Sequence, residues 1–344
     1  MRPEPGGEPI HTRALGARMA RREDGRLGVH GSLLDLRTRG FLPLAGSMQG
    51  MGIIHHMELD WVVDPETLAV ERFEPAQPTV AFEATPETLG ESCRQPMDAV
   101  RALAGVRLGD GFARTLREAI GGALGCSHVL TLALHLDAAV RTMLAGDRAA
   151  FPDRWRGAYA GPVARRDVVF DGHALDDGRV SVALRLGDLH WNAAPPTVLA
   201  PERLWRHAEL AATVTVDLWP GELVALTGAE RTRTADAFAG VRWVDRSAEL
   251  SALVGLGLAR GAAGAIMRRL GDDPAMAPWR DALLQLAPAL VQCRAAHGDA
   301  WHEKVRATPR HPGLTAVPDS CWMWRRDGAL DRIRAEHGAG KGGR

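Results

Sequence analysis

The sequence has few cysteines, no net charge and no obvious membrane segment, and each of these features excludes some classes of protein. Its 344 residues include four scattered cysteines, too few for a disulfide framework and typical of a reducing cytoplasm. Forty-two basic residues balance forty-two acidic ones, which argues against a nucleic-acid partner because such a partner usually requires a basic face. No apolar run is expected to approach the roughly 18 residues of a membrane span. Residues 1–7 lack the apolar core of a signal peptide, so we expect a cytoplasmic protein with no membrane partner.

The sequence does contain a long internal repeat. Residues 24–29, Asp-Gly-Arg-Leu-Gly-Val, with Asp35 beyond them, recur 153 positions later as residues 177–182, with Asp188 beyond. A second set recurs 150 positions later: Leu103, Gly105, Leu108, Gly111 and Gly121 match Leu253, Gly255, Leu258, Gly261 and Gly271. A period this long is far beyond that of a solenoid, so the repeat predicts two domains of one fold.

Within the first copy, strand-like segments precede helical ones. Residues 27–37 alternate as a strand does, residues 57–73 favour a hairpin, and residues 129–144 space apolar side chains as a helix does. We therefore predict an α+β fold of two tandem antiparallel-sheet-plus-helices domains, an intrachain pseudo-dimer whose second copy is degenerate. The expected division is a first copy at 10–148, a linker at 149–163, a second copy at 164–335, and loose tails at 1–9 and 336–344.

Only the first copy keeps a set of residues suited to chemistry. It contains Gly-Cys-Ser-His at 125–128, where the register of the second copy has Pro-Ala-Met-Ala-Pro at 274–278. Cys93 falls opposite Trp243, and His55 falls opposite Arg206. Residues that both copies share are interpreted as scaffold, and residues that one copy lost as dispensable for folding. We therefore place any functional site in the first copy.

Five stretches resemble a bacterial family known only as domain of unknown function 2889 (DUF2889). They are residues 9–13, the Arg-Glu-Asp-Gly at 22–25, His55-x-Met57, the Gly-Cys-Ser-His at 125–128, and a closing signature at 319–328. The resemblance covers nearly the whole chain, and it implies kinship without an activity.

A more distant resemblance is to the iron–sulfur scaffold fold (NifU/IscU-like), in which a hairpin and a long helix supply Asp, Cys and His ligands. The resemblance implies that His55 takes the place of the Asp, Cys93 that of the middle cysteine, and Cys126 with His128 that of the last pair. The first cysteine of that family would fall near Ile53 and is absent. The implied site is therefore one zinc or iron ion, not the usual cluster.

The residues support that metal site but leave alternatives open. Two thiolates and two imidazoles, from His55, Cys93, Cys126 and His128, satisfy the preference of zinc for four sulfur and nitrogen ligands. The sequence lacks the close Cys-x-x-Cys spacing that marks zinc sites most clearly. Either His55 or His56 faces the site, since neighbours on a strand point in opposite directions.

A metal-free enzyme is the second hypothesis. Cys126 would act as nucleophile, with His128 or His55 as base, or the histidines would act alone, in a lyase, isomerase or hydrolase of small molecules. A third is a non-enzymatic binding or assembly protein, with Cys126 merely packed at a helix start. No nucleotide cofactor is expected, because the glycines at 255–261 lack dinucleotide-loop spacing. The segment 321–326 either folds back over the first copy, with an arginine holding an anion, or closes the second domain as an edge strand.

Overall fold

The computed structural model describes residues 6–40, 42–44, 47–150, 160–191, 204–218, 221–234, 237, 239–258, 261–297 and 318–339. A nine-stranded antiparallel sheet dominates them, in the order β11-β10-β9-β8-β7-β1-β2-β5-β6. Its strands are β1 (Glu8–Arg21), β2 (Leu27–Arg37), β5 (Gly52–Val63), β6 (Val70–Thr79), β7 (Gly161–Ala174), β8 (Arg179–Trp191), β9 (Leu204–Asp217), β10 (Glu222–Thr234) and β11 (Val244–Asp245). The short strands β3 (Leu42–Leu44) and β4 (Ser47–Gln49) form a separate pair.

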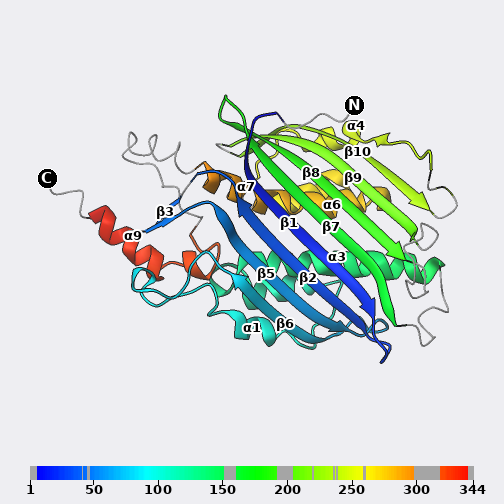
Figure 1. Ribbon diagram of the computed structural model, residues 1–344, viewed down its shortest axis with the longest axis horizontal. Coiled ribbons are helices and arrows are strands. Elements are labelled where there is room, and N and C mark those ends of the chain that lie inside the picture. The colour runs from blue at the N-terminus through cyan, green and yellow to red at the C-terminus, as the bar shows by residue number, and fades with distance from the viewer. Residues whose placement is uncertain are drawn as a thin grey trace.

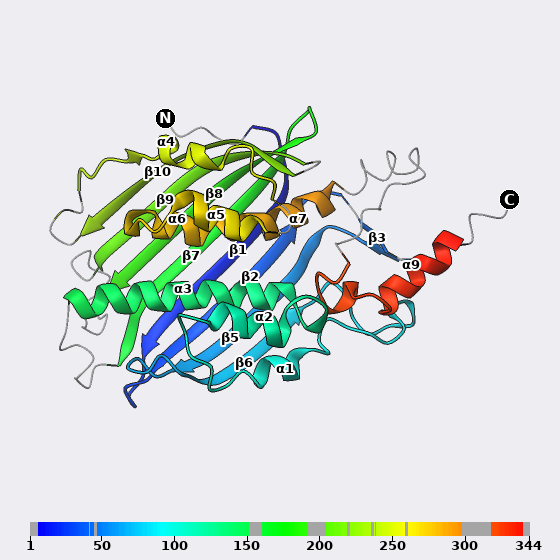
Figure 2. The same ribbon diagram turned by 180° about the vertical axis from the view of Figure 1, so that it is seen from behind.

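The helices cover one face of this sheet and leave the other bare, as Figures 1 and 2 show from the two sides. They are α1 (Met97–Arg101), α2 (Phe112–Ile120), α3 (Ser127–Ala150), α4 (Ser247–Leu250), α5 (Ala262–Leu270), α6 (Ala277–Leu283) and α7 (Leu286–Ala296), with α9 (Ala329–Ala339) beyond the sheet edge. Single 3₁₀ turns occur at Pro86–Thr88, Gly122–Leu124, Ser251–Leu253, Pro274–Met276 and Trp322–Trp324. We call the covered side the helix face and the bare side the open face.

The predicted α+β class is confirmed, and so are three of its elements, among them the helix expected at 129–144, which lies within α3. The strand expected at 27–37 is β2, and the expected hairpin is β5 with β6. The strand order divides the sheet into two halves. Strands β1, β2, β5 and β6 form one half, strands β7 to β11 form the other, and β1 pairs with β7 where the halves meet. The division into two domains stays a prediction. Residues 151–159 of the expected linker lie outside the described residues.

Strict alternation along β2 decides which side chains reach the core. Its buried and half-buried residues alternate without interruption, so odd-numbered positions face the helices and even-numbered positions face solvent. The helix-facing leucines and valines join one core cluster with apolar residues of α3, including Leu132 and Leu136. Helix α3 packs across β1, β2 and β5. This packing brings the first turn of α3 above the end of β2.

Helix α3 overturns one sequence-based expectation. Its segment Ser127–Gly146 is 20 residues long with a mean hydropathy of 1.3, so it is long and apolar enough to cross a membrane by length and composition. The absence of any such apolar run was therefore wrongly predicted. In this structure 56% of the segment is buried inside the protein, as in a core helix that is apolar on most sides.

The segment 318–339 packs against the first half of the chain, which matches the fold-back alternative for the tail. The backbone N–H of Trp322 donates to the Gly125 carbonyl at 2.7 Å. Glu91 accepts hydrogen bonds from the Arg325 guanidinium at 2.7 Å and from the Ala329 backbone N–H at 3.0 Å. Arg325 therefore pairs with a carboxylate of the protein itself.

The close approach of α3 to β2 depends on Gly31. A Cβ atom at this position would lie 2.7 to 3.0 Å from three side-chain carbons of Leu136, which is fully buried in the core. We predict that Gly31→Ala lowers the free energy of unfolding by about 1–3 kcal/mol. Gly28→Ala, on the open face of the same strand, is the control and should change it by less than about 0.5 kcal/mol. Equal free energies of unfolding for the Gly31→Ala and Gly28→Ala variants in denaturant titrations would contradict this packing.

Glu91 should control how firmly the C-terminal segment is held. Glu91→Gln keeps the shape but removes the charge that binds Arg325, so amide hydrogen exchange in α9 should accelerate about tenfold. Glu87→Gln, at an exposed position of the Pro86–Thr88 turn, is the matched control and should leave exchange unchanged. Unchanged exchange in the Glu91 variant would show that other contacts hold the segment.

Candidate functional site

Asp35 is a fully buried carboxylate on the helix face of β2. The sheet register places Arg13 of β1 directly opposite it on one side and His55 of β5 on the other. Arg13 Nη1 lies 3.4 Å from Oδ2 and 3.5 Å from Oδ1, while His11 Nε2 lies 3.4 Å from Oδ1. Nitrogen-bearing side chains of the two strands that flank β2 thus surround the carboxylate.

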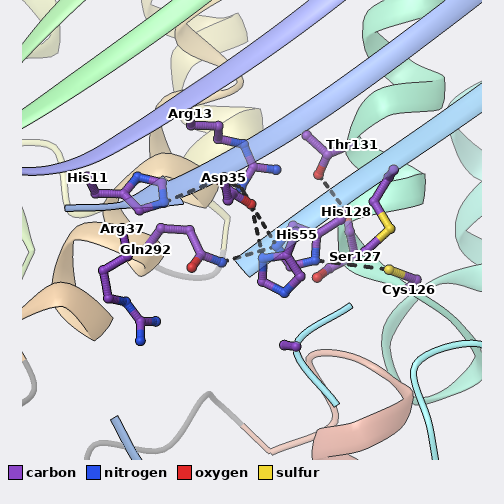
Figure 3. A network of polar contacts seen from close by, with 12 residues as sticks. His11, Arg13, Asp35, Arg37, His55, Cys126, Ser127, His128, Thr131 and Gln292 are labelled. Atoms are coloured by element: carbon purple, nitrogen blue, oxygen red, sulfur yellow. Dashed lines mark hydrogen bonds and ion pairs between the residues drawn. The ribbon is translucent and has the colours of Figure 1, made fainter. Parts of the chain in front are cut away.

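Two histidines meet at one oxygen of Asp35. His55 Nδ1 lies 3.2 Å from Oδ2, and Nε2 of His128, in the first turn of α3, lies 3.3 Å from it. The two imidazole rings stack with centroids 3.7 Å apart. The oxygen and the two nitrogens all lie within 4.8 Å of one another, an arrangement that could hold a metal ion. Figure 3 shows the group, which with His11 and Arg13 we call the Asp35 centre.

A register shift in β5 aims His55 at this centre. The pairing of β2 with β5 moves from Asp35–His55 to Leu36–Ile53, so one residue of β5, Ile54, is inserted there. Such a bulge changes the direction of neighbouring side chains. His55 becomes buried, whereas His56 faces the other way and pairs with Glu58 at 3.3 Å. His55 is therefore the member of the pair that faces the site.

Burial and charge set the protonation of the centre. Burial alone would raise the pKa of Asp35, but the charge of Arg13 and the adjacent imidazoles of His128 and His55 hold that pKa well below its usual range. Burial, reinforced by His55, lowers the pKa of His128 to about 3. Burial lowers the pKa of His11 to about 4 against the attraction of Asp35. The centre therefore presents an ionised carboxylate at Asp35 and neutral imidazoles at His11 and His128 at physiological pH.

The second half of the chain contributes Gln292. This residue, on α7, places its side-chain nitrogen 3.1 Å from His128 Nε2. The nearby Arg37 is also buried, but it donates to the backbone and side-chain oxygens of Gln49. The Asp35 centre is therefore bounded by both halves of the sheet and its helices.

The two predicted cysteine ligands lie to one side of this group. Cys126 Sγ is 4.0 Å from His128 Nδ1, the ring nitrogen that faces away from Asp35. Cys93 is half-buried and packs, with Cys321, against Phe82 and Met323. Burial raises the pKa of the Cys126 thiol and raises that of Cys93 well above its usual value. The structure thus brings His55, His128 and Cys126 together, and it leaves Cys93 outside the Asp/His group.

Sequence reasoning missed Asp35 as a candidate ligand, although a signal for it existed. Asp35 recurs as Asp188 in the repeat, and shared residues were interpreted as scaffold. Asp188 is also buried, yet Arg166 binds it with two hydrogen bonds of 2.7 and 2.6 Å and also reaches Asp281. The looser contacts of Arg13 leave Asp35 accessible to imidazoles. Asp35 and Asp188, which match in the repeat, therefore have different partners in the two halves of the chain.

One comparison with known proteins found a match, and it covers part of the chain. An α+β protein with a buried two-histidine, one-carboxylate group is the class that fold and site define. Residues 11–141 match the family described as "Protein of unknown function (DUF2889)". The match supports the resemblance for the first half of the chain, and it contains every residue of the Asp35 centre. No curated protein and no solved structure matches the chain.

His135, seven residues after His128 on α3, should make the protein sensitive to acid. Burial, with the nearby Arg166, lowers the pKa of His135 to about 3. Its imidazole titrates near 6.5 in the unfolded chain, so the unfolded state binds the proton first as the pH falls below that value. Between pH 6.5 and 5 this difference should remove about 2 kcal/mol from the free energy of unfolding.

The variant His135→Leu removes that proton linkage. Denaturant titrations at pH 7 and pH 5 should therefore show a smaller loss of stability in this variant than in the wild type. An identical loss in both proteins would mean that His135 titrates normally in the folded state.

Proposed function

We propose that the Asp35 centre binds one divalent transition-metal ion, zinc or iron(II), through Asp35, His55 and His128. The observation that carries this proposal is the convergence of one carboxylate oxygen and two imidazole nitrogens within 4.8 Å. Neutral imidazole and ionised carboxylate are the forms that such ions require. The set resembles the two-histidine, one-carboxylate arrangement of non-haem iron sites as well as catalytic zinc sites.

The geometry of the free atoms supports this assignment. Ligand atoms 3.2 to 3.3 Å apart, as Asp35 Oδ2 is from each histidine nitrogen, suit a common ion at about 2.0–2.2 Å from each. His55 Nδ1 is buried and has no aligned hydrogen-bond partner among the described residues. His128 Nε2 faces both Asp35 and the Gln292 side-chain nitrogen, more partners than one ring nitrogen can satisfy. An ion would use these lone pairs.

Three protein ligands leave coordination positions open, which is typical of catalytic sites and not of structural ones. Arg13, beside Asp35, has two buried guanidinium nitrogens, Nε and Nη2, without a hydrogen-bond partner among the described residues. A small molecule with an anionic group would satisfy them while it occupies an open position on the metal. We therefore propose metal-dependent chemistry on a small molecule within the cytoplasm.

We also infer that the chain arose by duplication and that only one copy kept a metal site. In support, Arg13 and Asp35 correspond to Arg166 and Asp188 at the same offset of 153 residues, on strands with the same pairing. In the second half the guanidinium of Arg166 forms an ion pair with the Asp188 carboxylate. A protein cation thus stands where the first copy would hold a metal.

Metal analysis with paired histidine variants tests the proposal. Anaerobically purified wild-type protein should hold about one zinc or iron per chain by elemental mass spectrometry. His55→Ala should weaken metal affinity at least about tenfold because it removes a direct ligand. His56→Ala is the matched control on the same strand and should keep the metal. A wild-type protein that binds neither zinc(II) nor iron(II) when the metal salt is added would contradict the proposal.

The cysteine variants separate this ligand set from the thiolate set. Cys126→Ser and Cys93→Ser should retain the metal if Asp35, His55 and His128 hold it. Loss of the metal in either variant would instead favour the set that includes Cys93 and Cys126.

A metal-free thiol enzyme is the second candidate, and one observation favours it. Cys126 Sγ, the His128 ring and Asp35 lie in the order nucleophile, base and orienting carboxylate. The distance of 4.0 Å between sulfur and Nδ1 is long for activation, and burial keeps the thiol protonated. Rapid modification of Cys126 by iodoacetamide at neutral pH, abolished in His128→Ala, would support this candidate over the metal site.

A further inference from the structure

The open face of the sheet contains a hollow that the Asp35 centre does not use. Its volume is about 750 Å³, within the range of small-molecule sites. Its lining residues come from strands β1, β2, β5, β6, β7 and β8, and they include Gly28 and His30, even-numbered positions of β2 that face away from the helices. We call it the arginine trough, because four of its lining residues are Arg18, Arg22, Arg72 and Arg165.

The sheet register explains the floor of the trough. Pro162, Ala20, Gly28 and Val62 are consecutive cross-strand partners on β7, β1, β2 and β5. Small side chains in one row lower the surface between taller neighbours, and four strands extend such a row over about 14 Å. A Cβ atom at Gly28 would make only ordinary contacts, at 3.6 Å or more, with Ala20 and the Arg22 side chain, so the floor has room for a larger side chain at this residue.

The adjacent row supplies the wall. Arg165, Arg18, His30 and Asp60 are cross-strand partners in the next row on the same face, two residues along β1, β2 and β5 and three along β7, where the register shifts. Arg72 is the partner of Val62 on β6 and closes the row of the floor, while Trp191 of β8 adds an aromatic side chain. The trough therefore has an apolar floor with cationic groups on one wall and at one end.

Most of the polar groups in the trough are already paired. Arg22 pairs with Asp24, Arg165 with Asp167, and His30 with Asp60. The exposed Arg18 and Arg72 differ, because neither pairs with a carboxylate among the described residues. Two unneutralised guanidinium groups beside an apolar floor give the trough a positive potential that suits an anion.

We propose that the arginine trough binds an amphipathic organic anion, a small molecule whose apolar body lies over Ala20, Gly28 and Val62 while its carboxylate or sulfonate meets Arg18 or Arg72. The sheet separates this site from the Asp35 centre on the helix face. The proposal therefore does not depend on metal binding.

Two fluorescent probes that share an apolar body test the proposal on the metal-free and metal-loaded chain. One is 1-anilinonaphthalene-8-sulfonate, and the other is N-phenyl-1-naphthylamine, which lacks the sulfonate. The double variant Arg18→Gln/Arg72→Gln should weaken binding of the sulfonate about tenfold and leave the neutral probe within about twofold. Gly28→Leu fills the floor and should weaken binding of both probes about tenfold.

Matched variants show whether these effects belong to the trough. Gly187→Leu adds the same side chain to the open face of β8, where a Cβ meets nothing within 4 Å, outside the trough lining. Arg117→Gln/Arg268→Gln removes two exposed arginines from α2 and α5. Both controls should bind the probes as the wild type does. Unchanged probe affinity in Gly28→Leu would overturn the proposal. Equal losses of probe affinity in a trough variant and its matched control would overturn it as well.

Discussion

The burial of one carboxylate, Asp35, is the constraint on which the site depends. An ionised carboxylate without water is tolerated only when charged or hydrogen-bonding groups surround it. The neighbouring strands and α3 supply those groups at positions that the sheet register and helix packing fix. Arg13 neutralises the charge loosely, and the imidazoles of His55 and His128 share one oxygen. A metal cation would neutralise this loosely paired carboxylate and bind the imidazole nitrogens beside it.

The second half shows what the same position becomes when protein groups satisfy it fully. Arg166 binds Asp188 through two short hydrogen bonds and reaches Asp281 as well, so a protein cation already neutralises that carboxylate. The central pairing of β1 with β7 joins the two halves in one sheet, and Gln292 of the second half reaches His128 of the first. The second half therefore stabilises and bounds the site.

Local patterns predicted the elements, whereas contacts across the sheet decided the site. Alternation at residues 27–37 predicted β2, and the Cys and His residues that the second half of the sequence lacks predicted a site in the first half. His55 and His128 were predicted together, and they do meet. Asp35 was missed because its repetition in the sequence made it look like scaffold, although burial with different partners gives it a different role. The bulge that aims His55 inward and the row of small residues beneath the arginine trough depend on strand register, which no local pattern reveals.

X-ray absorption at the metal edge of the loaded wild-type protein tests the central claim most directly. The account predicts a first shell of nitrogen and oxygen atoms at about 2.0–2.2 Å, from two imidazoles, one carboxylate and water or another small ligand. A sulfur shell at about 2.3 Å would contradict it, because that distance would place Cys93 or Cys126 on the metal in place of Asp35.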